Sequence, residues 1–426
     1  MQTATSEITT AGNENQTDWW QRDDLAFIDN ELHFAGHRVQ DLAEQFGTPV
    51  FVYSLARAKA NLERLHNALC DAGFSDKGLK DNDSNANYRI LYAMKANRFG
   101  PLLTSLKLSG LCGIDACSPQ EVELAVSCGF SPADISFTAG SLSQEDYRVL
   151  NRYRDLNINC DSLHAIKTWG ELRPGGSIGI RVNPGLGVSR EGNERLQYAG
   201  QAITKFGIYQ EQFHEALTLA KQFNLTISRI HFHTGCGYLT EQIPQLDQVV
   251  SRCMWFVEQC DSIERVNIGG GLGVPHDAAD GRLDVNAWAR MLFKHFKNKP
   301  FKLDVEPGEY VMKDAGLLLL SKTYLEKKAD TLFLGVDAGF NLAPEPAFYD
   351  LRFQPLPLSR PAGQQTAEKV TVVGNINEAL DVFYRDALMP DMRDARYLTL
   401  INAGAYSTSM ASNHCARGQH REYLLT

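Results

Sequence analysis

The stretch Arg89-Ile-Leu-Tyr-Ala-Met-Lys-Ala96 decides the fold, because it is the first of eight short runs that look like buried β-strands. Amphipathic, helix-like segments separate most of these runs, and such alternation indicates β/α units. Eight units predict a (β/α)8 barrel of the TIM type. The other seven runs are CGIDACS (112–118), DISFTAG (134–140), NINCDS (157–162), SIGIRVN (177–183), SRIHFHT (228–234), RVNIGGG (265–271) and KLDVEPG (302–308).

A doubly wound open sheet is the competing α/β architecture. The count of eight, and the lack of a G-x-G-x-x-G turn after the first run, favour the barrel, which we expect over residues 55–308. Beyond it the chain changes to short strand-like runs with turn residues, which predicts a β domain over residues 309–426. Residues 19–54 are expected to join that domain. The polar residues 1–18 are predicted to form a disordered tail.

Composition limits the class of partner. The formal charge of −9 over 426 residues gives nucleic acid or an anionic membrane no electrostatic reason to bind, so a small molecule is the expected partner. The nine cysteines are odd in number and none has C-x-x-C spacing, which predicts reduced thiols and no metal site. No targeting or membrane segment is visible, so a soluble cytoplasmic protein is expected.

Reactive residues follow several of the predicted strands, where barrels of this type place their chemistry. Burial of Lys95 would lower its pKa and free the amine to form an imine, although a lysine at a strand end is often simply solvated. Gly269, Gly270 and Gly271 would let backbone N–H groups approach a phosphate, unless they only form a tight turn. Glu306 could hold a protonated pyridine nitrogen or serve as an ordinary ion-pair partner.

Together these motifs resemble the fold-type III pyridoxal-phosphate (PLP) decarboxylases, which include diaminopimelate, ornithine and arginine decarboxylases. The nearest likeness is to the diaminopimelate branch. This implies a barrel followed by a β-barrel-like domain, and a homodimer whose active sites are built between two subunits. The motifs, in the family's order, are GTPVFVY, YAMKAN, GIDACSPQE, NCDS, RVNP with KFGI, HFHTG, IGGGLG, EPG, VDAGFN and GAYSTSMASN.

The resemblance implies a role for each matching residue. Lys95 would hold PLP as a Schiff base, His233 would stack on the cofactor ring, and Glu306 would pair with the pyridine nitrogen. Residues 269–271 and Tyr406 would bind the phosphate. These roles agree with the chemistry expected from the residues themselves.

The segment Gly374-Asn-Ile-Asn377-Glu378-Ala-Leu-Asp381 matches the family's Gly-x-x-Cys-Glu-Ser-x-Asp stretch, which reaches into the partner subunit's site. Glu378 would face the substrate, and Asn377 replaces the cysteine that acts as an acid in the family. An amide cannot supply that proton, so water or Lys95 becomes the candidate donor. The serine on the family's phosphate side is Cys236 here.

Two arginines of the diaminopimelate branch are also replaced. Glu309 follows EPG in place of one, and Glu345 precedes Pro-Ala-Phe-Tyr349 in place of the other. Two carboxylates in one pocket would repel a distal carboxylate and attract an ammonium. The expected substrate is therefore an ornithine-type or lysine-type diamino acid, and the D-isomer is as open as the L-isomer. Asp337, Tyr349 and Glu378 are further candidates for substrate contacts.

Other functions stay open on sequence alone. Diaminopimelate itself, or a larger amine-bearing conjugate of the kind used in siderophore assembly, could be the substrate. An inactive decarboxylase-like regulator is opposed by the retention of Lys95, His233, Glu306 and Glu378. A PLP racemase would need an opposing base, and the EPG and Asn-Glu segments favour decarboxylation instead.

Overall fold

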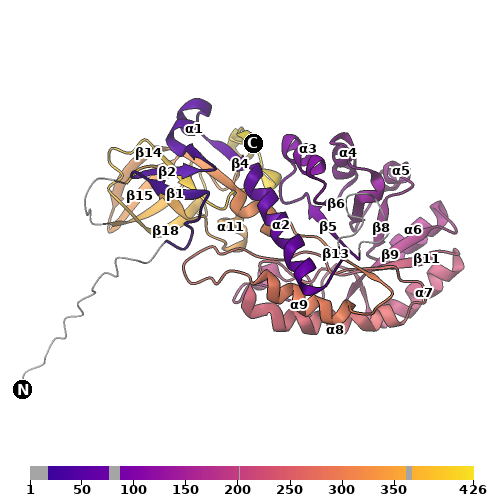
Figure 1. Cartoon of the computed structure of the whole chain (residues 1–426). Helices are drawn as coiled ribbons and strands as arrows, with labels where there is room; N and C mark the ends of the chain where they lie inside the picture. Colours follow the sequence, from indigo (N-terminus) through magenta and orange to yellow (C-terminus); the bar gives the residue numbers. More distant parts are fainter. Residues whose placement is uncertain (1–17, 76–86, 201, 361–366) are drawn as a thin grey trace, which may run out of the picture.

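The computed structural model describes residues 18–75, 87–200, 202–360 and 367–426. Figure 1 shows a β/α barrel with a separate β domain beside it. The predicted disordered tail lies outside the described residues, except for Asp18.

Eight parallel strands form a closed barrel, and each of the eight predicted runs overlaps one of them. Strand β13 pairs in parallel with β5, which closes the barrel, and β9 pairs with both β8 and β11. The predicted fold class is confirmed. The strands are β5 (Tyr88–Ala93), β6 (Gly113–Ala116), β7 (Ile135–Thr138), β8 (Asn157–Cys160), β9 (Ser177–Asn183), β11 (Thr226–His231), β12 (Arg265–Asn267) and β13 (Lys302–Val305); the short β10 (Ile208–Tyr209) pairs with β9.

Helices surround the barrel, and α2, which precedes the first barrel strand, packs against both α9 and α3. Serine side chains begin three of these helices directly after strands: Ser54, Ser118 and Ser162 each accept a backbone N–H of the first turn at 3.1 Å. The helices are α2 (Leu55–Ala72), α3 (Gly100–Ser109), α4 (Pro119–Ser127), α5 (Gln144–Leu150), α6 (Leu163–Leu172), α7 (Phe213–Gln222), α8 (Ile243–Glu258) and α9 (Val285–Phe296).

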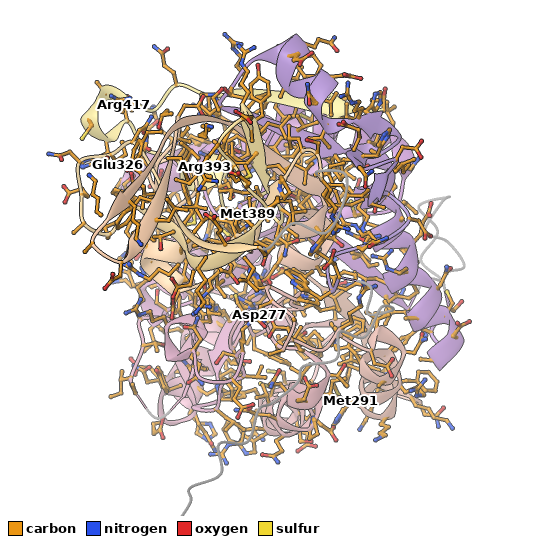
Figure 2. All side chains as sticks on the ribbon, turned by 90° about the vertical axis from the view of Figure 1, so that its left-hand side faces the viewer. Asp277, Met291, Glu326, Met389, Arg393 and Arg417 are labelled. Atoms are coloured by element: carbon orange, nitrogen blue, oxygen red, sulfur yellow. The ribbon has the colours of Figure 1, made fainter. Side chains whose placement is uncertain are left out.

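The β domain is one mixed sheet in the order β16-β19-β14-β15-β17-β18. Near the N-terminus, β4 pairs antiparallel with β14 and parallel with the C-terminal β20, so both ends of the chain enter this sheet. Figure 2 views the molecule from this side, with Glu326, Met389 and Arg393 labelled in the domain. The strands are β4 (Val50–Ser54), β14 (Gly316–Lys328), β15 (Thr331–Val336), β16 (Pro355–Pro357), β17 (Glu368–Val373), β18 (Val382–Met389), β19 (Tyr397–Leu400) and β20 (Arg421–Leu425).

Short elements complete the architecture. A small hairpin sheet, β1 (Leu25–Ile28), β2 (Glu31–Phe34) and β3 (His37–Arg38), precedes α1 (Val39–Phe46). Buried residues of these elements pack against one face of the β domain in a second hydrophobic core. Helices α10 (Glu309–Met312) and α11 (Glu345–Tyr349) follow β13 and β15.

A buried ion cluster ties three barrel strands together. The carboxylate of Asp304 accepts hydrogen bonds from Arg89 Nε at 3.0 Å and Arg265 Nε at 2.8 Å. Burial disfavours the charged form of Asp304, but Arg265 and Arg89 outweigh burial and hold its pKa well below the usual range. Both arginines lie at the starts of their strands, away from the strand ends that are expected to hold the chemistry, so this cluster has a structural role.

Candidate active site

A cavity at the C-terminal ends of the barrel strands brings together most of the residues predicted to bind the cofactor. Parallel strands of a closed barrel all end at the same rim, so side chains far apart in the sequence meet there. The described residues that line the cavity are Ala93, Lys95, Asp115, His233, Cys236, Gly270, Gly271, Glu306, Gly308, Glu309 and Tyr406.

Lys95 lies in the turn after β5 and extends into this cavity. Its pKa is raised well above the usual lysine value: Cys117 and Asp115 favour the ammonium form, and together they outweigh the loss of hydration. Burial lowers the pKa of Lys95, as expected, but the net shift is upward, so the expectation of a lowered pKa is wrong. The reason is the proximity of Cys117 and Asp115, which lie just after and within the next strand and so could not be inferred from strand one alone.

Glu306 follows β13 and is the centre of a buried hydrogen-bond network. Its Oε2 lies 2.9 Å from His231 Nε2, and its Oε1 accepts from Asn267 Nδ2 at 2.5 Å and Ser136 Oγ at 3.0 Å. Burial raises the pKa of Glu306, but the charge and hydrogen bond of His231 outweigh it, and the net pKa is below the usual value. Glu306 is therefore a fixed carboxylate directed by three neighbours.

His233 presents a neutral ring to the same cavity. Burial, with the nearby charges of Lys95 and Arg181, lowers its pKa well below the usual value. Its Nδ1 accepts the N–H of Gly270 at 3.3 Å, which places the proton on Nε2, 3.5 Å from Cys236 Sγ. A flat, uncharged imidazole held from both nitrogens suits stacking on an aromatic cofactor.

The glycine loop after β12 leaves no room for side chains. A Cβ on Gly270 would overlap the backbone oxygen of Glu306, and one on Gly271, whose φ is +97°, would overlap that of Gly235. Gly269, with a φ of +71°, comes just before the cavity wall, which Gly270 and Gly271 form. This close backbone approach is the arrangement that lets N–H groups contact an anion.

Tyr406 reaches the cavity from the β domain, in the loop after β19. Its backbone N–H donates to the carbonyl oxygen of Ala96 at 2.8 Å, which ties this loop to the turn that contains Lys95. The two domains therefore share the wall of a single cavity.

Glu309, the first residue of α10, is the predicted substrate residue that lies in the cavity wall. Its Oε1 accepts the N–H of Val274 at 3.3 Å and lies 3.7 Å from His276 Nε2. Burial raises its pKa, but the nearby His276 and the charge of Lys313 outweigh burial, so the net pKa is lowered. Glu309 therefore presents a negative charge where the diaminopimelate branch presents an arginine.

Glu345 does not share this position. Its carboxylate forms an ion pair with Lys313 Nζ, both side chains are almost completely buried, and neither residue lines the cavity. The prediction of two unpaired carboxylates in one pocket is therefore corrected to one, because Lys313 neutralises the second. Burial lowers the pKa of Lys313, against the attraction of Glu309.

Two further predicted substrate residues lie outside the cavity wall. Asp337 follows β15, and its carboxylate accepts from Thr48 Oγ1 and from the backbone N–H of Ser321, at 2.6 and 2.8 Å. Tyr349 ends α11, and its carbonyl oxygen accepts from Asn193 at 2.6 Å. Within one chain, neither residue is brought to the cofactor cavity.

Asn377 and Glu378 lie in an exposed loop between β17 and β18 and do not line this chain's own cavity. The buried carboxylate of Asp381 shapes the loop by accepting the N–H groups of Ile376 and Phe340, each at 2.6 Å. Glu378 is 48% exposed, with Oε1 3.4 Å from His414 Nε2. The loop is thus rigid at its base and open at its tip.

Sequence reasoning missed several residues of the site. Asp115 lines the cavity with an unpartnered buried oxygen, and His231 and Asn267 direct Glu306. The period-two spacing of His231 and His233 could have revealed the first histidine, because alternate residues of a strand share a face. Nothing in the sequence singles out Asn267 from other strand asparagines.

Known proteins match this chain along most of its length. Residues 77–313 match the family model described as "Pyridoxal-dependent decarboxylase, pyridoxal binding domain". The chain belongs to this family. A diaminopimelate decarboxylase of Methanothermobacter thermautotrophicus is 30% identical over 420 residues, which covers 94% of this chain and 93% of the relative. This chain is also 28% identical to the diaminopimelate decarboxylase of Escherichia coli K12 over 399 residues, 88% of each chain.

Solved structures agree with this assignment. The diaminopimelate decarboxylase of M. jannaschii, solved in complex with L-lysine, superposes with a TM-score of 0.81 at 26% identity, covering 95% of this chain and 93% of that one. The family resemblance is thereby confirmed, and the protein is a PLP-dependent amino-acid decarboxylase. In the part of the chain that the structure describes, no helix is long and apolar enough to cross a membrane.

The residues of the cavity fit PLP. Gly270 and Gly271 form a cradle that any side chain would fill, as a phosphate-binding wall requires. An ionised, immobile Glu306 suits a protonated ring nitrogen, and neutral His233 offers a ring face. We propose that Lys95 supplies the amine that holds the cofactor, and that Tyr406 assists at the phosphate.

Proposed function

We propose that this decarboxylase acts on a basic diamino acid of the ornithine or lysine type, in either the L- or the D-form, and releases CO2 and an amine. The observation that supports this substrate is the buried, negatively charged Glu309 in the wall of the cofactor cavity. An ammonium about 4 Å from such a carboxylate gains roughly 4 kcal/mol at an effective dielectric near 20, and a carboxylate loses a similar amount.

The groups around Glu309 do not cancel its negative charge, so the cavity favours an ammonium over a carboxylate. His276 has a lowered pKa because of burial, so at neutral pH it leaves the charge of Glu309 in place. Lys313 attracts Glu309 and is also paired with Glu345, so one ammonium faces two carboxylates. The local balance is therefore negative, which disfavours the second carboxylate of diaminopimelate.

PLP, when bound, supplies an electron sink for the electron pair left by the departing CO2. Glu306 would keep a proton on the ring nitrogen through its Oε1 or Oε2, and His231 keeps that carboxylate ionised. His233 would hold the ring in place from one face. Lys95 Nζ, which favours its protonated form, is our candidate to return a proton to the substrate carbon, with water as the alternative, because the Asn377 amide cannot act as an acid.

We further propose a homodimer in which the loop of Asn377 and Glu378 enters the partner's cavity. The loop is exposed and lies outside its own chain's cavity wall. Beside it, Leu380 is 46% exposed, and Phe348 of α11 is 50% exposed. These side chains would be covered when a second copy docks.

The test is a comparison of kcat/KM for L- and D-ornithine, L- and D-lysine and meso-diaminopimelate. We expect the native protein to prefer a diamino acid. Glu309→Gln should lower kcat/KM for that substrate about 10- to 100-fold, the effect of losing one charged hydrogen bond, and should leave diaminopimelate less affected. Glu258→Gln, which removes an exposed carboxylate at the end of α8, is the matched control.

Diaminopimelate decarboxylation is the second candidate, and the names of the relatives favour it. The same comparison decides between the two. A native preference for meso-diaminopimelate would exclude the charge argument built on Glu309. Turnover of none of the five amino acids would direct the search to a larger amine-bearing conjugate.

A further inference from the structure

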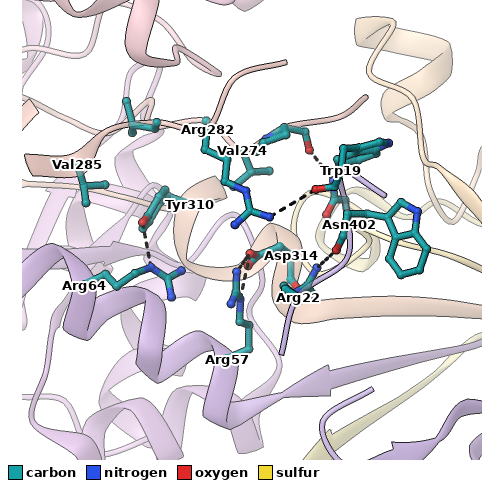
Figure 3. A pocket seen from close by; sticks show the side chains of 14 residues that line it. Trp19, Arg22, Arg57, Arg64, Val274, Arg282, Val285, Tyr310, Asp314 and Asn402 are labelled. Atoms are coloured by element: carbon teal, nitrogen blue, oxygen red, sulfur yellow. Dashed lines mark hydrogen bonds and ion pairs between the residues drawn. The ribbon is translucent and has the colours of Figure 1, made fainter. Parts of the chain in front are cut away.

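A second pocket lies between the N-terminal segment, α2, the loop after β12 and α10, outside the cofactor cavity (Figure 3). It contains four arginines from three separate parts of the chain. The described residues that line it are Trp19, Trp20, Arg22, Arg57, Arg64, Gly273, Val274, Pro275, Arg282, Leu283, Val285, Tyr310, Asp314 and Asn402.

Two of these arginines are already neutralised. Arg57 forms an ion pair with Asp314, and Arg22 Nε lies 2.7 Å from Asp24 Oδ1. Both arginine side chains are largely buried, at 19% and 10% exposure. These two arginines line the pocket, but nearby carboxylates neutralise their charges.

The other two arginines have no carboxylate partner among the described residues. Arg64 donates from Nε to the hydroxyl of Tyr310 at 3.3 Å and contacts Asn61 Oδ1. Arg282 donates from Nη2 to the carbonyl oxygen of Trp19 at 3.4 Å. Figure 3 shows both side chains directed into the pocket from opposite walls. Two guanidinium groups without counter-charges face a common space.

Much of the remaining wall is apolar, although Asn402 and Asp314 also line it. Trp19, Leu283 and Val285 line the pocket beside the arginines, so an occupant would meet hydrocarbon between two positive groups. Guanidinium groups recognise carboxylates and phosphates through paired N–H donors, and they do so most strongly where water is partly excluded.

We propose that this pocket binds a small organic anion, a polycarboxylate or a phosphate ester with a short carbon skeleton, held by Arg64 and Arg282. The site is distinct from the cofactor cavity but shares a wall with it. Val274 lines the arginine pocket, and its N–H donates to Glu309 Oε1 at 3.3 Å in the cavity. Tyr310, which bonds Arg64, is the next residue after Glu309.

Isothermal titration calorimetry tests the site. Citrate and glycerol 3-phosphate are the anionic probes, and glycerol is the uncharged control. The protein is first saturated with PLP and reduced with borohydride, so that the phosphate site of the cofactor cavity is filled. We expect saturable binding of at least one anion and none of glycerol. Binding should weaken as NaCl is raised. Which anion binds distinguishes carboxylate from phosphate recognition.

Arg64→Gln and Arg282→Gln should each raise the Kd about tenfold, because each removes one charged partner. Arg252→Gln removes an exposed arginine from α8 and should leave the Kd unchanged. Arg282 is exposed, so its variant reports on the site even if Arg64→Gln impairs folding. Absence of binding by both anions, or a Kd that Arg282→Gln leaves unchanged, would overturn the proposal. Neither result depends on which amino acid is decarboxylated.

Discussion

His231 Nε2 lies 2.9 Å from Glu306 Oε2, and both side chains are buried, Glu306 in the wall of the cofactor cavity and His231 behind it. The histidine does not line the cavity itself, so it acts on the reaction through the carboxylate. Its charge and hydrogen bond are what hold the pKa of Glu306 below the usual value against burial. The ionisation of Glu306 in the cavity therefore depends on His231, which does not line the cavity.

Replacing His231 with leucine should raise the pKa of Glu306 and narrow the pH range of activity. An ionised Glu306 with a lowered pKa keeps its charge as the solution becomes acidic, whereas without His231 it would bind a proton at a higher pH. In a profile of kcat against pH between pH 5 and 9, the acidic limb should therefore move to higher pH. His164→Leu, on the exposed face of α6, is the control. An unshifted acidic limb would show that His231 is only structural.

Replacement of Lys95 by alanine should abolish turnover and covalent retention of the cofactor. Borohydride reduction of the native enzyme should place a pyridoxyl group on the peptide that contains Lys95, as mass spectrometry can show. Lys221→Ala, which changes an exposed lysine of α7, should keep both properties. A pyridoxyl group on any other lysine would contradict the assignment.

The sequence predicted the barrel strand by strand, because buried parallel strands appear as short apolar runs and β/α alternation repeats along the chain. It also predicted that Lys95, His233, Gly270 and Glu306 meet, since all four follow barrel strands that end at one rim. These predictions depend on local pattern and on one topological rule.

The residues predicted to contact the substrate could not be placed as accurately from the sequence. Glu345 is neutralised by Lys313, a contact between α11 and the segment after α10 that no local pattern encodes. A lysine within the apolar stretch Tyr310-Val-Met-Lys-Asp-Ala-Gly-Leu was the available signal, because an unpaired lysine is rarely fully buried. The raised pKa of Lys95 likewise depends on Cys117 and Asp115, which come from the next strand and the turn after it.

Glu345→Gln should destabilise the fold by about 3–5 kcal/mol, because the buried ammonium of Lys313 loses the carboxylate in contact with it and keeps only the attraction of Glu309. The double variant Lys313→Met/Glu345→Gln removes both charges and should recover much of that loss. Urea denaturation at pH 7 of these two variants and of the single variant Lys313→Met completes a double-mutant cycle, and the coupling energy gives the strength of the pair. A loss in the double variant equal to the sum of the two single losses would mean that the pair contributes nothing.

Asp304→Asn should also destabilise the barrel by about 3–5 kcal/mol at neutral pH, since Arg89 and Arg265 would lose their shared carboxylate. The folded pKa of Asp304 is lowered, so its contribution is complete above its unfolded pKa and is lost as the pH falls through the folded value. The difference between native and variant stability should therefore persist at pH 5 in urea denaturation. Asp155→Asn, at an exposed position, is the control and should change little.

Lys95→Ala and Glu378→Ala subunits, each inactive alone, should regain activity when mixed. If Glu378 enters the partner's cavity, a heterodimer contains one site with both residues replaced and one with both intact. Random exchange makes half of the dimers mixed, so about a quarter of all sites should be native and activity should approach a quarter of the wild-type value. Subunits with two different affinity tags demonstrate exchange by co-purification. Full exchange without recovered activity would show that Glu378 does not complete a site across the interface.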